Sequence, residues 1–306
     1  MRAVGLGFAI AVGLAGCTVQ RDYAPPDAPG TDGYPPPRTD LVPAIGSPTT
    51  LEIATWNIEN FPDTSLTASY VADVIASLDL DIVVVEEIAS ETAWAELLER
   101  LPEHDGVLST HTYSPTEYQK IGIVYRSSLV TVGAPTLLFT NDAYAFPRPP
   151  FSIPVTVDGD TFEVIGVHLK AGGALEDAQR RTLAVAALDQ HLRDQIDSGG
   201  ESEVIVLGDY NERVTTDDSR AVLAPLLTAP DRYNVRTEPS ALAGGVTYLG
   251  FGGTWIDHIT TTSGLASWFG AARVVVPRLD AMIPGYRSTI SDHLPVVMVV
   301  DRPPVR

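Results

Sequence analysis

Short, nearly uninterrupted runs of Val and Ile recur along the chain and constrain its fold more than any other feature. Runs such as those at 81–87 and 204–209 contain too few polar positions to alternate, which is typical of strands covered on both faces. The pattern predicts strands at 51–57, 81–87, 121–126, 161–168, 204–209, 255–260, 273–276 and 294–300.

Helical spacing of apolar residues separates these strands. Ser65 is a predicted N-cap, and the apolar residues that follow it up to Leu78 share one helix face. The same spacing recurs at 94–101 and at 188–196. Hydrophobic residues make up 44% of the 306 residues, which is enough for a sizeable core, and the charged fraction of 19% excludes a generally disordered chain. Periodicity alone indicates a domain of α/β or α+β class.

The formal net charge of −19 argues against long-range steering of the protein towards polyanions such as DNA or RNA. It does not exclude a nucleic-acid substrate, because at physiological salt the field is screened over roughly 8 Å. A local cation in a cleft can therefore dominate the contact with a phosphate.

The first residues predict a targeting signal. Arg2 precedes an apolar run over 3–15, which is shorter than the ~20 residues that span a bilayer and is typical of a signal peptide. The run ends in Leu-Ala-Gly before Cys17 and resembles a bacterial lipobox, which implies a lipidated Cys17; an ordinary signal peptide is the alternative. We expect a signal peptide over 1–16 and a chain held at the bacterial cell envelope, on the periplasmic face or the cell surface.

Cys17 is the single cysteine, so no intramolecular disulfide can form. Eight prolines with scattered Gly, Asp and Thr follow it up to Pro48, without apolar periodicity. This composition predicts an extended tether over 17–48. The globular domain is then expected over 49–306, as a monomer attached to the membrane by its lipid.

Polar side chains stand at the ends of several predicted strands, where an apolar core does not require them. Open sheets place ligand-binding side chains at such ends. One polar residue there is usually a turn or a cap, but a set of them indicates a site. The segments concerned end in Asn57, Glu86-Glu87, His168, Asp209-Tyr210-Asn211, Asp257-His258 and Ser291-Asp292-His293.

These residues form a chemically coherent set. Glu87 can hold a hard divalent cation, which offsets charge developing on a phosphoryl group. His293 can act as a general base or as a cation that stabilises phosphate, with a nearby Asp to orient its ring. Asp209 and Asn211 can position a water nucleophile and hold a phosphoryl oxygen. Asp257 is followed by His258, which strand alternation directs away from the site.

The ordered segments resemble the endonuclease/exonuclease/phosphatase superfamily, which includes deoxyribonuclease I, abasic-site endonucleases, bacterial sphingomyelinases and inositol polyphosphate 5-phosphatases. Each segment is weakly specific, but together they span nearly the whole globular region in the family's order. They are TWNIEN at 55–60, DIVVVEEI at 81–88, GVHLKAGG at 166–173, VLGDYNE at 206–212, WIDHI at 255–259 and SDHLPV at 291–296.

The resemblance implies an α+β fold of deoxyribonuclease I type, a four-layer sandwich of two packed mixed β-sheets flanked by α-helices. It implies a metal site for Mg²⁺, or Mn²⁺ or Ca²⁺, with Glu87 as the main ligand and Asn57 and Asp292 nearby. It also implies that Asn57 contacts substrate. The implied catalytic residues are His293 with its orienting Asp257, the pair Asp209 and Asn211, and the phosphate-facing His168.

Arg148, Glu86 and the segment 244–255 each allow a functional and a structural interpretation. Arg148 resembles an arginine that contacts substrate phosphate in the deoxyribonuclease I branch; a solvated loop charge is the alternative. The family often has Gln-Glu at 86–87, so Glu86 either tightens metal binding or caps a strand. The glycine- and aromatic-rich segment 244–255 is expected to pack as a loop over a sheet edge.

The resemblance implies a metal-dependent phosphodiester hydrolase, and three functions compete. The first is a nuclease-like phosphodiesterase that hydrolyses DNA or RNA outside the cytoplasm. The second is a sphingomyelinase-like enzyme or a phosphomonoester hydrolase, although no clear aromatic hairpin for entering a membrane is present. The third is a catalytically silent surface-binding domain, which the presence of Glu87, Asp209, Asn211, Asp257 and His293 disfavours.

Overall fold

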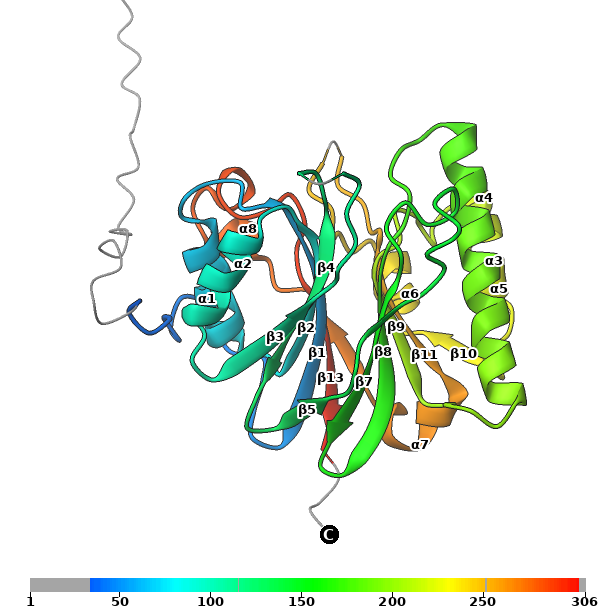
Figure 1. Ribbon diagram of the computed structural model, residues 1–306, viewed down its shortest axis with the longest axis horizontal. Helices are drawn as coiled ribbons and strands as arrows, with labels where there is room; N and C mark the ends of the chain where they lie inside the picture. Colours follow the sequence, from blue (N-terminus) through cyan, green and yellow to red (C-terminus); the bar gives the residue numbers. More distant parts are fainter. Residues whose placement is uncertain (1–33, 115, 251, 303–306) are drawn as a thin grey trace, which may run out of the picture.

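Two β-sheets lie face to face between two layers of helices, as the computed structural model of the chain shows (Figure 1). The structure describes residues 34–114, 116–250 and 252–302. The expected four-layer α+β sandwich is confirmed. The predicted signal peptide and Cys17 lie outside the described residues.

The first sheet has six strands in the order β12-β13-β1-β2-β4-β3. Its central strands β1 and β2 are parallel, and every other neighbouring pair is antiparallel. The strands are β1 (Thr50–Phe61), β2 (Ile82–Ile88), β3 (His104–Leu108), β4 (Lys120–Arg126), β12 (Arg273–Val275) and β13 (Val296–Asp301).

The second sheet has seven strands, with the order β10-β11-β9-β8-β7-β5 and with β6 also paired to β7. Here β8 and β9 form the parallel pair. The strands are β5 (Val130–Val132), β6 (Thr136–Leu137), β7 (Phe151–Val157), β8 (Asp160–His168), β9 (Val204–Asp209), β10 (Tyr233–Val235) and β11 (Asp257–Thr262). Each sheet therefore has a central strand pair whose carboxyl ends lie side by side.

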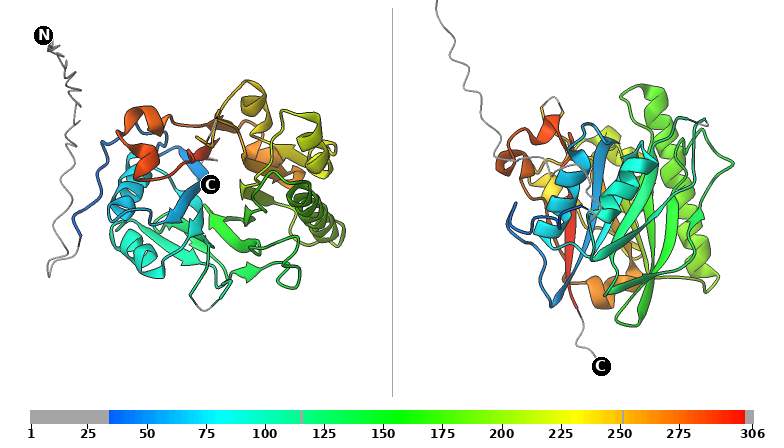
Figure 2. Two further views of the ribbon diagram at one scale, coloured as in Figure 1. Left: turned by 90° about the horizontal axis from the view of Figure 1, so that it is seen from above. Right: turned by 60° about the vertical axis from the view of Figure 1, so that its left-hand side comes forward.

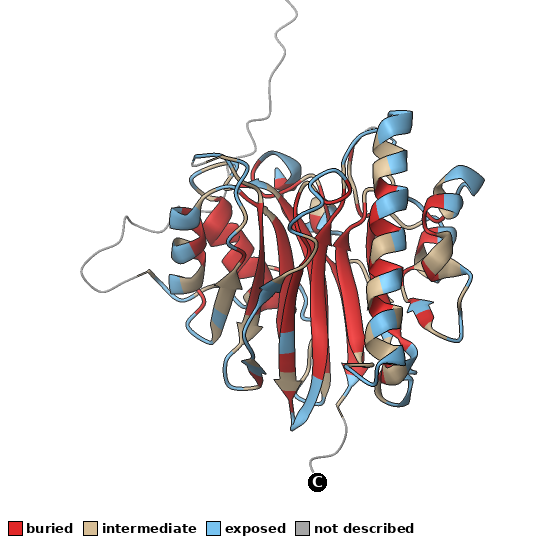
Figure 3. Cartoon of the chain, turned by 45° about the vertical axis from the view of Figure 1, so that its right-hand side comes forward, coloured by how far each residue is buried: buried red, intermediate tan, exposed pale blue. Residues whose placement is uncertain are grey.

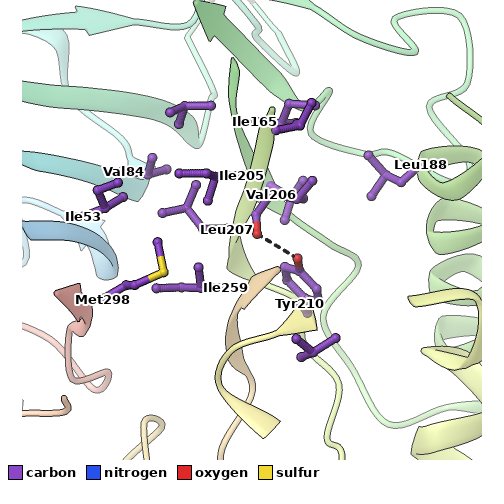
Figure 4. Close-up of a cluster of buried hydrophobic side chains, with 14 of the residues drawn as sticks. Ile53, Val84, Ile165, Leu188, Ile205, Val206, Leu207, Tyr210, Ile259 and Met298 are labelled. Carbon is purple, nitrogen blue, oxygen red and sulfur yellow. Dashed lines mark hydrogen bonds between the residues drawn. The ribbon is translucent and has the colours of Figure 1, made fainter. Parts of the chain in front are cut away.

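Alternation along the strands divides the apolar residues between the layers. Ile53 and Val84 of the first sheet pack with Leu207 and Ile259 of the second sheet in the central core, which Figure 4 shows. Neighbouring residues such as Trp56 point to the other face and pack under the helices of the first layer. Both faces of the central strands are buried, which explains why their sequences are almost entirely apolar (Figure 3).

Helices cover the outer face of each sheet (Figure 2). Helices α1 (Thr67–Leu78), α2 (Glu91–Glu99) and α8 (Leu279–Met282) accompany the first sheet, with the 3-10 turn at Tyr286–Ser288. The second sheet carries α3 (Leu175–Asp197), α4 (Asp217–Val222), α5 (Ala224–Leu227) and α6 (Glu238–Leu242), while the turn Ser263–Leu265 leads into α7 (Ala266–Phe269). No helix of the described residues has the length and apolar character needed to cross a bilayer.

Residues 34–48, which we predicted to be part of the tether, pack against the domain. The backbone N–H groups of Arg38 and Leu41 donate to Asp73 and Ser77 of α1, at 2.8 and 3.0 Å. Val42 is buried in the layer beneath α1. We call residues 34–48 the strap; the packed structure begins there rather than at residue 49.

Strand positions follow the sequence more closely than the shorter elements do. The eight predicted strands are all present, with ends that differ by up to four residues. Ser65 is not the N-cap of α1, which begins at Thr67 without a side-chain cap. Strand β7 lies outside the predicted strands and contains Pro154, a residue that is rare in strand interiors. The Pro154 carbonyl accepts from the Gly133 N–H, on the side of β7 that pairs with β5 and β6. These two short strands are interrupted opposite Pro154, so no strand residue there needs a backbone N–H from position 154.

The buried carboxyl group of Glu52 predicts a pH dependence of stability. Burial, together with Asp81 and Asp79, raises the pKa of Glu52 to about 8, while Thr50 opposes the shift. Between pH 4.5 and 8 the unfolded chain ionises Glu52 and the folded chain does not, so stability falls as pH rises, by at most ~1.4 kcal/mol per unit.

Replacing Glu52 by Gln should remove this dependence. Urea unfolding of both proteins at pH 5 and pH 8 should show that the wild type loses more stability than Glu52→Gln over this interval. Equal losses in the two proteins would contradict the assignment.

Candidate active site

A cavity of about 570 Å³ lies at the carboxyl ends of the two parallel strand pairs. Glu59 of β1 and Glu87 of β2 line it from the first sheet, and His168 of β8 and Asp209 of β9 line it from the second. Asp292 and His293, from the segment before β13, complete the lining between the sheets. The fold thus brings the predicted strand-end residues together.

His293 and Asp257 form a buried pair. The Nδ1 atom of His293 lies 3.0 Å from both carboxylate oxygens of Asp257. A carboxylate only accepts hydrogen bonds, so Nδ1 carries the proton and donates it. The Nε2 atom then faces the cavity, 4.0 Å from Asp209 Oδ2 and 3.7 Å from Asp292 Oδ1. The predicted orienting contact between Asp257 and His293 is present in the geometry.

The backbone around His293 is fixed from several directions. Ser291 Oγ accepts the His293 N–H at 2.8 Å and donates to the Asn57 carbonyl at 2.6 Å. The His293 carbonyl accepts from Tyr286 Oη at 2.5 Å and from Trp56 Nε1 at 3.3 Å. These contacts tie the segment before β13 to the end of β1, so the imidazole is held in place before any substrate arrives.

The charges of this group are strongly coupled. Burial lowers the pKa of His293, but Asp257, Asp209 and Asp292 outweigh it and raise that pKa to about 10. Burial and the nearby Asp257 raise the pKa of Asp209 to about 7. His168 is the opposite case, because burial and the charges of Arg148 and His293 lower its pKa well below the usual value and keep it neutral.

Asn57 joins the carboxylates of the two sheets. Its Nδ2 donates to Glu87 Oε1 at 3.1 Å and to Asp209 Oδ2 at 3.2 Å. Its Oδ1 accepts the Glu59 N–H at 3.0 Å, so this oxygen is engaged by the backbone. His168 Nε2 lies 3.7 Å from the same two carboxylate oxygens of Glu87 and Asp209. Asn57 is placed to orient both acids.

Several site residues have an unusual backbone conformation. Glu59, Asn60, Glu87 and Asn211 have φ values of 42°, 46°, 66° and 51°. Non-glycine residues rarely adopt positive φ, and such strain clusters at functional sites. The left-handed turn at Asn211 places its N–H on Asp209 Oδ1 at 2.8 Å, and Asn211 Nδ2 on the Leu169 carbonyl at 3.2 Å.

Comparison with known proteins agrees with this geometry. The model of the Endonuclease/Exonuclease/phosphatase family matches residues 54–293, which is most of the chain. The chain belongs to this family. No curated protein sequence matches it.

Solved structures of the family share the fold at low sequence identity. D. rerio TDP2 complexed with a single-strand DNA product is 17% identical with a TM-score of 0.58, over 82% of this chain and 99% of that one. A family protein from Bacteroides thetaiotaomicron is 15% identical with a TM-score of 0.60, over 85% and 98%. The 3′ phosphatase NExo from Neisseria, bound to a product DNA hairpin, is 19% identical with a TM-score of 0.58, over 81% and 98%.

Family enzymes typically depend on a divalent metal, and the residues present fit one. The carboxylates of Glu59, Glu87 and Asp292 face one part of the cavity without a Lys or Arg partner among the described residues. Burial and their mutual repulsion raise the pKa of Glu59 and of Asp292. Carboxylate oxygens are the donors that a hard cation requires. The acidic group whose ligand atoms all lie within 4.8 Å of one another, Asp209 and Asp257 with His293, lies beside them. Glu59 stands in the TWNIEN motif, yet it was not among the predicted ligands.

Glu86 follows neither of the two sequence interpretations. It is fully buried, accepts from Thr55 Oγ1 at 2.7 Å, and does not line the cavity. Burial raises its pKa well above the usual value, with Asp257 and Asp209 adding to the shift. Glu86 is therefore a buried neutral carboxyl group, neither a cavity ligand nor an exposed cap.

Two other polar residues also lie behind the cavity wall. Arg148 Nε and Nη2 donate to the carbonyls of His168 and Leu169 at 3.1 and 2.6 Å, and Arg148 is not in the cavity lining. Its predicted substrate contact stays a prediction. His258 points away from the cavity as expected, and contacts Thr237 Oγ1 and the Glu212 carbonyl at 2.8 and 3.0 Å.

The segment 244–255 contributes more than the expected loop packing. Trp255 is buried as predicted, but Tyr248 lines the cavity with its ring centroid 4.9 Å from that of His293. A Cβ at Gly250 would lie 2.1–2.5 Å from the Tyr248 ring and hydroxyl, so a larger residue there would displace the ring. The aromatic content of segment 244–255 was visible in the sequence. The backbone pairing that turns Tyr248 towards His293 was not.

Arg148→Ala should lower stability by about 2 kcal/mol, because it removes a buried donor and leaves two carbonyls without it. Urea unfolding measures the loss. The control is Arg273→Ala, which truncates an exposed arginine that has no ionic partner in the described structure. Equal stability of the two variants would contradict the structural role.

Proposed function

We propose that the protein is a metal-dependent phosphodiesterase that hydrolyses nucleic acid outside the cytoplasm. One observation carries the proposed catalysis: Asp209, Asp257 and His293 are buried with ligand atoms all within 4.8 Å of one another, at the end of a cavity lined by further carboxylates. A cluster of this kind destabilises the fold and is explained by chemistry rather than by packing.

In the proposed reaction each residue has a separate role. Asp209 accepts a proton from the attacking water, and Asn57 and the Asn211 N–H hold its carboxylate. His293, oriented by Asp257, presents Nε2 to a phosphoryl oxygen. The neutral His168 lies beside both carboxylates and can donate to a second oxygen. Glu87, Asp292 and Glu59 would hold the cation, which supplies positive charge to the phosphoryl group.

Nucleic acid is favoured over lipid by two related structures. A TDP2 structure and the NExo structure contain DNA products. NExo is a 3′ phosphatase, which makes a phosphomonoester on DNA the second candidate.

The test of this function is a substrate panel with and without metal. The purified protein should hydrolyse DNA or RNA with Mg²⁺ or Mn²⁺, lose activity in EDTA, and regain it when metal is restored. A higher kcat/KM on sphingomyelin or inositol phosphates than on nucleic acid would overturn the substrate choice. Release of phosphate from a 3′-phosphorylated strand without internal cleavage would favour the phosphatase.

Glu87→Gln should shift the metal concentration needed for half-maximal activity upwards, or abolish activity, because one hard ligand loses its charge. The matched control is Glu99→Gln at the exposed end of α2, which changes the net charge equally. An unchanged metal requirement in Glu87→Gln would contradict its role as a ligand.

His293→Ala should lower kcat on the order of 10²-fold or more, the usual scale for losing one donor that stabilises charge developing on an oxygen. Asp257→Asn should also lower kcat, because the amide can present a donor to Nδ1. The double variant should lose less than the sum of the two separate losses in ln kcat, since the residues act as a unit. Additive losses would show that Asp257 does not serve His293.

The proposed location rests on the sequence resemblance at Cys17. Cys17→Ser should move the protein from the membrane fraction to the soluble or unprocessed fraction. Fractionation with and without detergent measures this, and unchanged membrane association would rule out the lipid anchor.

A further inference from the structure

We propose that Arg213 forms a second phosphate-binding subsite, which engages a phosphate neighbouring the one that is cleaved. The proposal rests on the proposed function and deepens it, because such a subsite selects a substrate with consecutive phosphates over an isolated phosphodiester. Three features support it: the charge distribution of the cavity, the anchoring of the Arg213 backbone, and the size of the cavity.

The charge of the cavity is unevenly distributed. Glu59, Glu87, Asp209 and Asp292 place acidic groups near His293. The basic residues that line the cavity are Arg181 and Arg213, both on the side of α3 and the segment between β9 and α4. A polyanionic substrate therefore meets positive charge beyond the catalytic group on this side only, as far as the described lining residues extend.

Arg181 is already committed to structural contacts. Its Nε donates to Glu212 Oε2 at 2.8 Å, and its Nη1 donates to the carbonyls of Lys170 and Gly172 at 2.8 and 2.9 Å. Lys170 nearby is paired with Asp177 at 2.8 Å. The charges of Arg181 and Lys170 are therefore paired with carboxylates. Most of the Arg181 donors are already used in protein hydrogen bonds, so neither residue is well placed to bind a phosphate.

Arg213 differs from them. It is exposed, and within the described residues no carboxylate lies within 4.0 Å of its guanidinium. An arginine side chain presents a planar fork of donors that matches a phosphate. At a net charge of −19 the protein cannot attract phosphate from a distance, so an uncompensated guanidinium acts only at short range.

The backbone that carries Arg213 is fixed although its side chain is not. The Arg213 N–H donates to Glu212 Oε1 at 3.2 Å, and the Glu212 carbonyl contacts His258 Nε2 at 3.0 Å. The Glu212 carboxylate is in turn held by Arg181. Arg213 also follows Asn211 by two residues, so the backbone position from which its side chain extends is fixed relative to the proposed cleavage position.

The cavity has room for more than one phosphoryl group. Its volume of about 570 Å³ lies within the ~300–1,000 Å³ typical of pockets for drug-sized ligands. Gly173 also lines the cavity, and an added Cβ there would meet no atom within 4 Å, so the wall is open at this position. A nucleotide unit with a flanking phosphate fits this description.

The test uses dinucleotides with one and two phosphates. Thymidylyl-thymidine has a single internal phosphate, and its 5′- and 3′-phosphorylated forms add a second phosphate on either side. For one of these forms the wild type should show a KM about 5- to 10-fold lower than for the parent, a contribution expected of a charged hydrogen bond at a partly exposed site. Arg213→Gln should abolish that advantage, so that the variant has the same KM for all three substrates.

Arg273→Gln is the control, because it removes the same charge from an exposed arginine on β12, outside the cavity lining. Equal KM values for all three substrates in the wild type would overturn the subsite while leaving the proposed function intact. An advantage that persists in Arg213→Gln would do the same. Absence of any hydrolysis with Mg²⁺ or Mn²⁺ would instead overturn the proposed function.

Discussion

The packing of the two sheets against each other holds the site as well as the core. Asn57 of the first sheet donates to Asp209 of the second, and His293, next to the first sheet, pairs with Asp257 of the second. Each of these pairs therefore takes one member from each sheet. The apolar side chains between the sheets fix their separation, so a shift of one sheet relative to the other would break both contacts together.

The same packing explains how so many acids are tolerated. Burial opposes ionisation of Asp209, Glu86 and Asp292. Repulsion from Asp257, in the case of Asp209 and Glu86, and from Glu87, in the case of Asp292, adds to the cost. Three features reduce the electrostatic repulsion. Glu86 is protonated, the imidazolium of His293 lies beside Asp257, and the amide of Asn57 donates to the carboxylates of Glu87 and Asp209. The carboxylates near Glu87 are the least compensated, which is why they fit a cation.

The sequence predicted the central strands and most of the site because both leave local signals. Continuous Val and Ile runs indicate strands buried on two faces. Polar residues at the ends of these strands indicate the site at the edge of the sheets. The rest depends on tertiary geometry. No spacing indicates that Asn57 turns its amide to the acids, that Glu86 points into the core, or that Arg148 supports backbone carbonyls. Tyr248 reaches the cavity only through its pairing beside His293.

The strap determines how a mechanical load would enter the domain. A pull applied at residue 34 reaches the contacts of Arg38, Leu41 and Gly46 with helix α1 before it reaches β1, which begins at Thr50. These hydrogen bonds and the buried Val42 would have to slip along the helix first. Asn57 and Glu59 lie further along β1, at the opposite end of that strand. Tension at residue 34 therefore loads the contacts between the strap and α1 before it loads β1, and it reaches the end of β1 that carries Asn57 last.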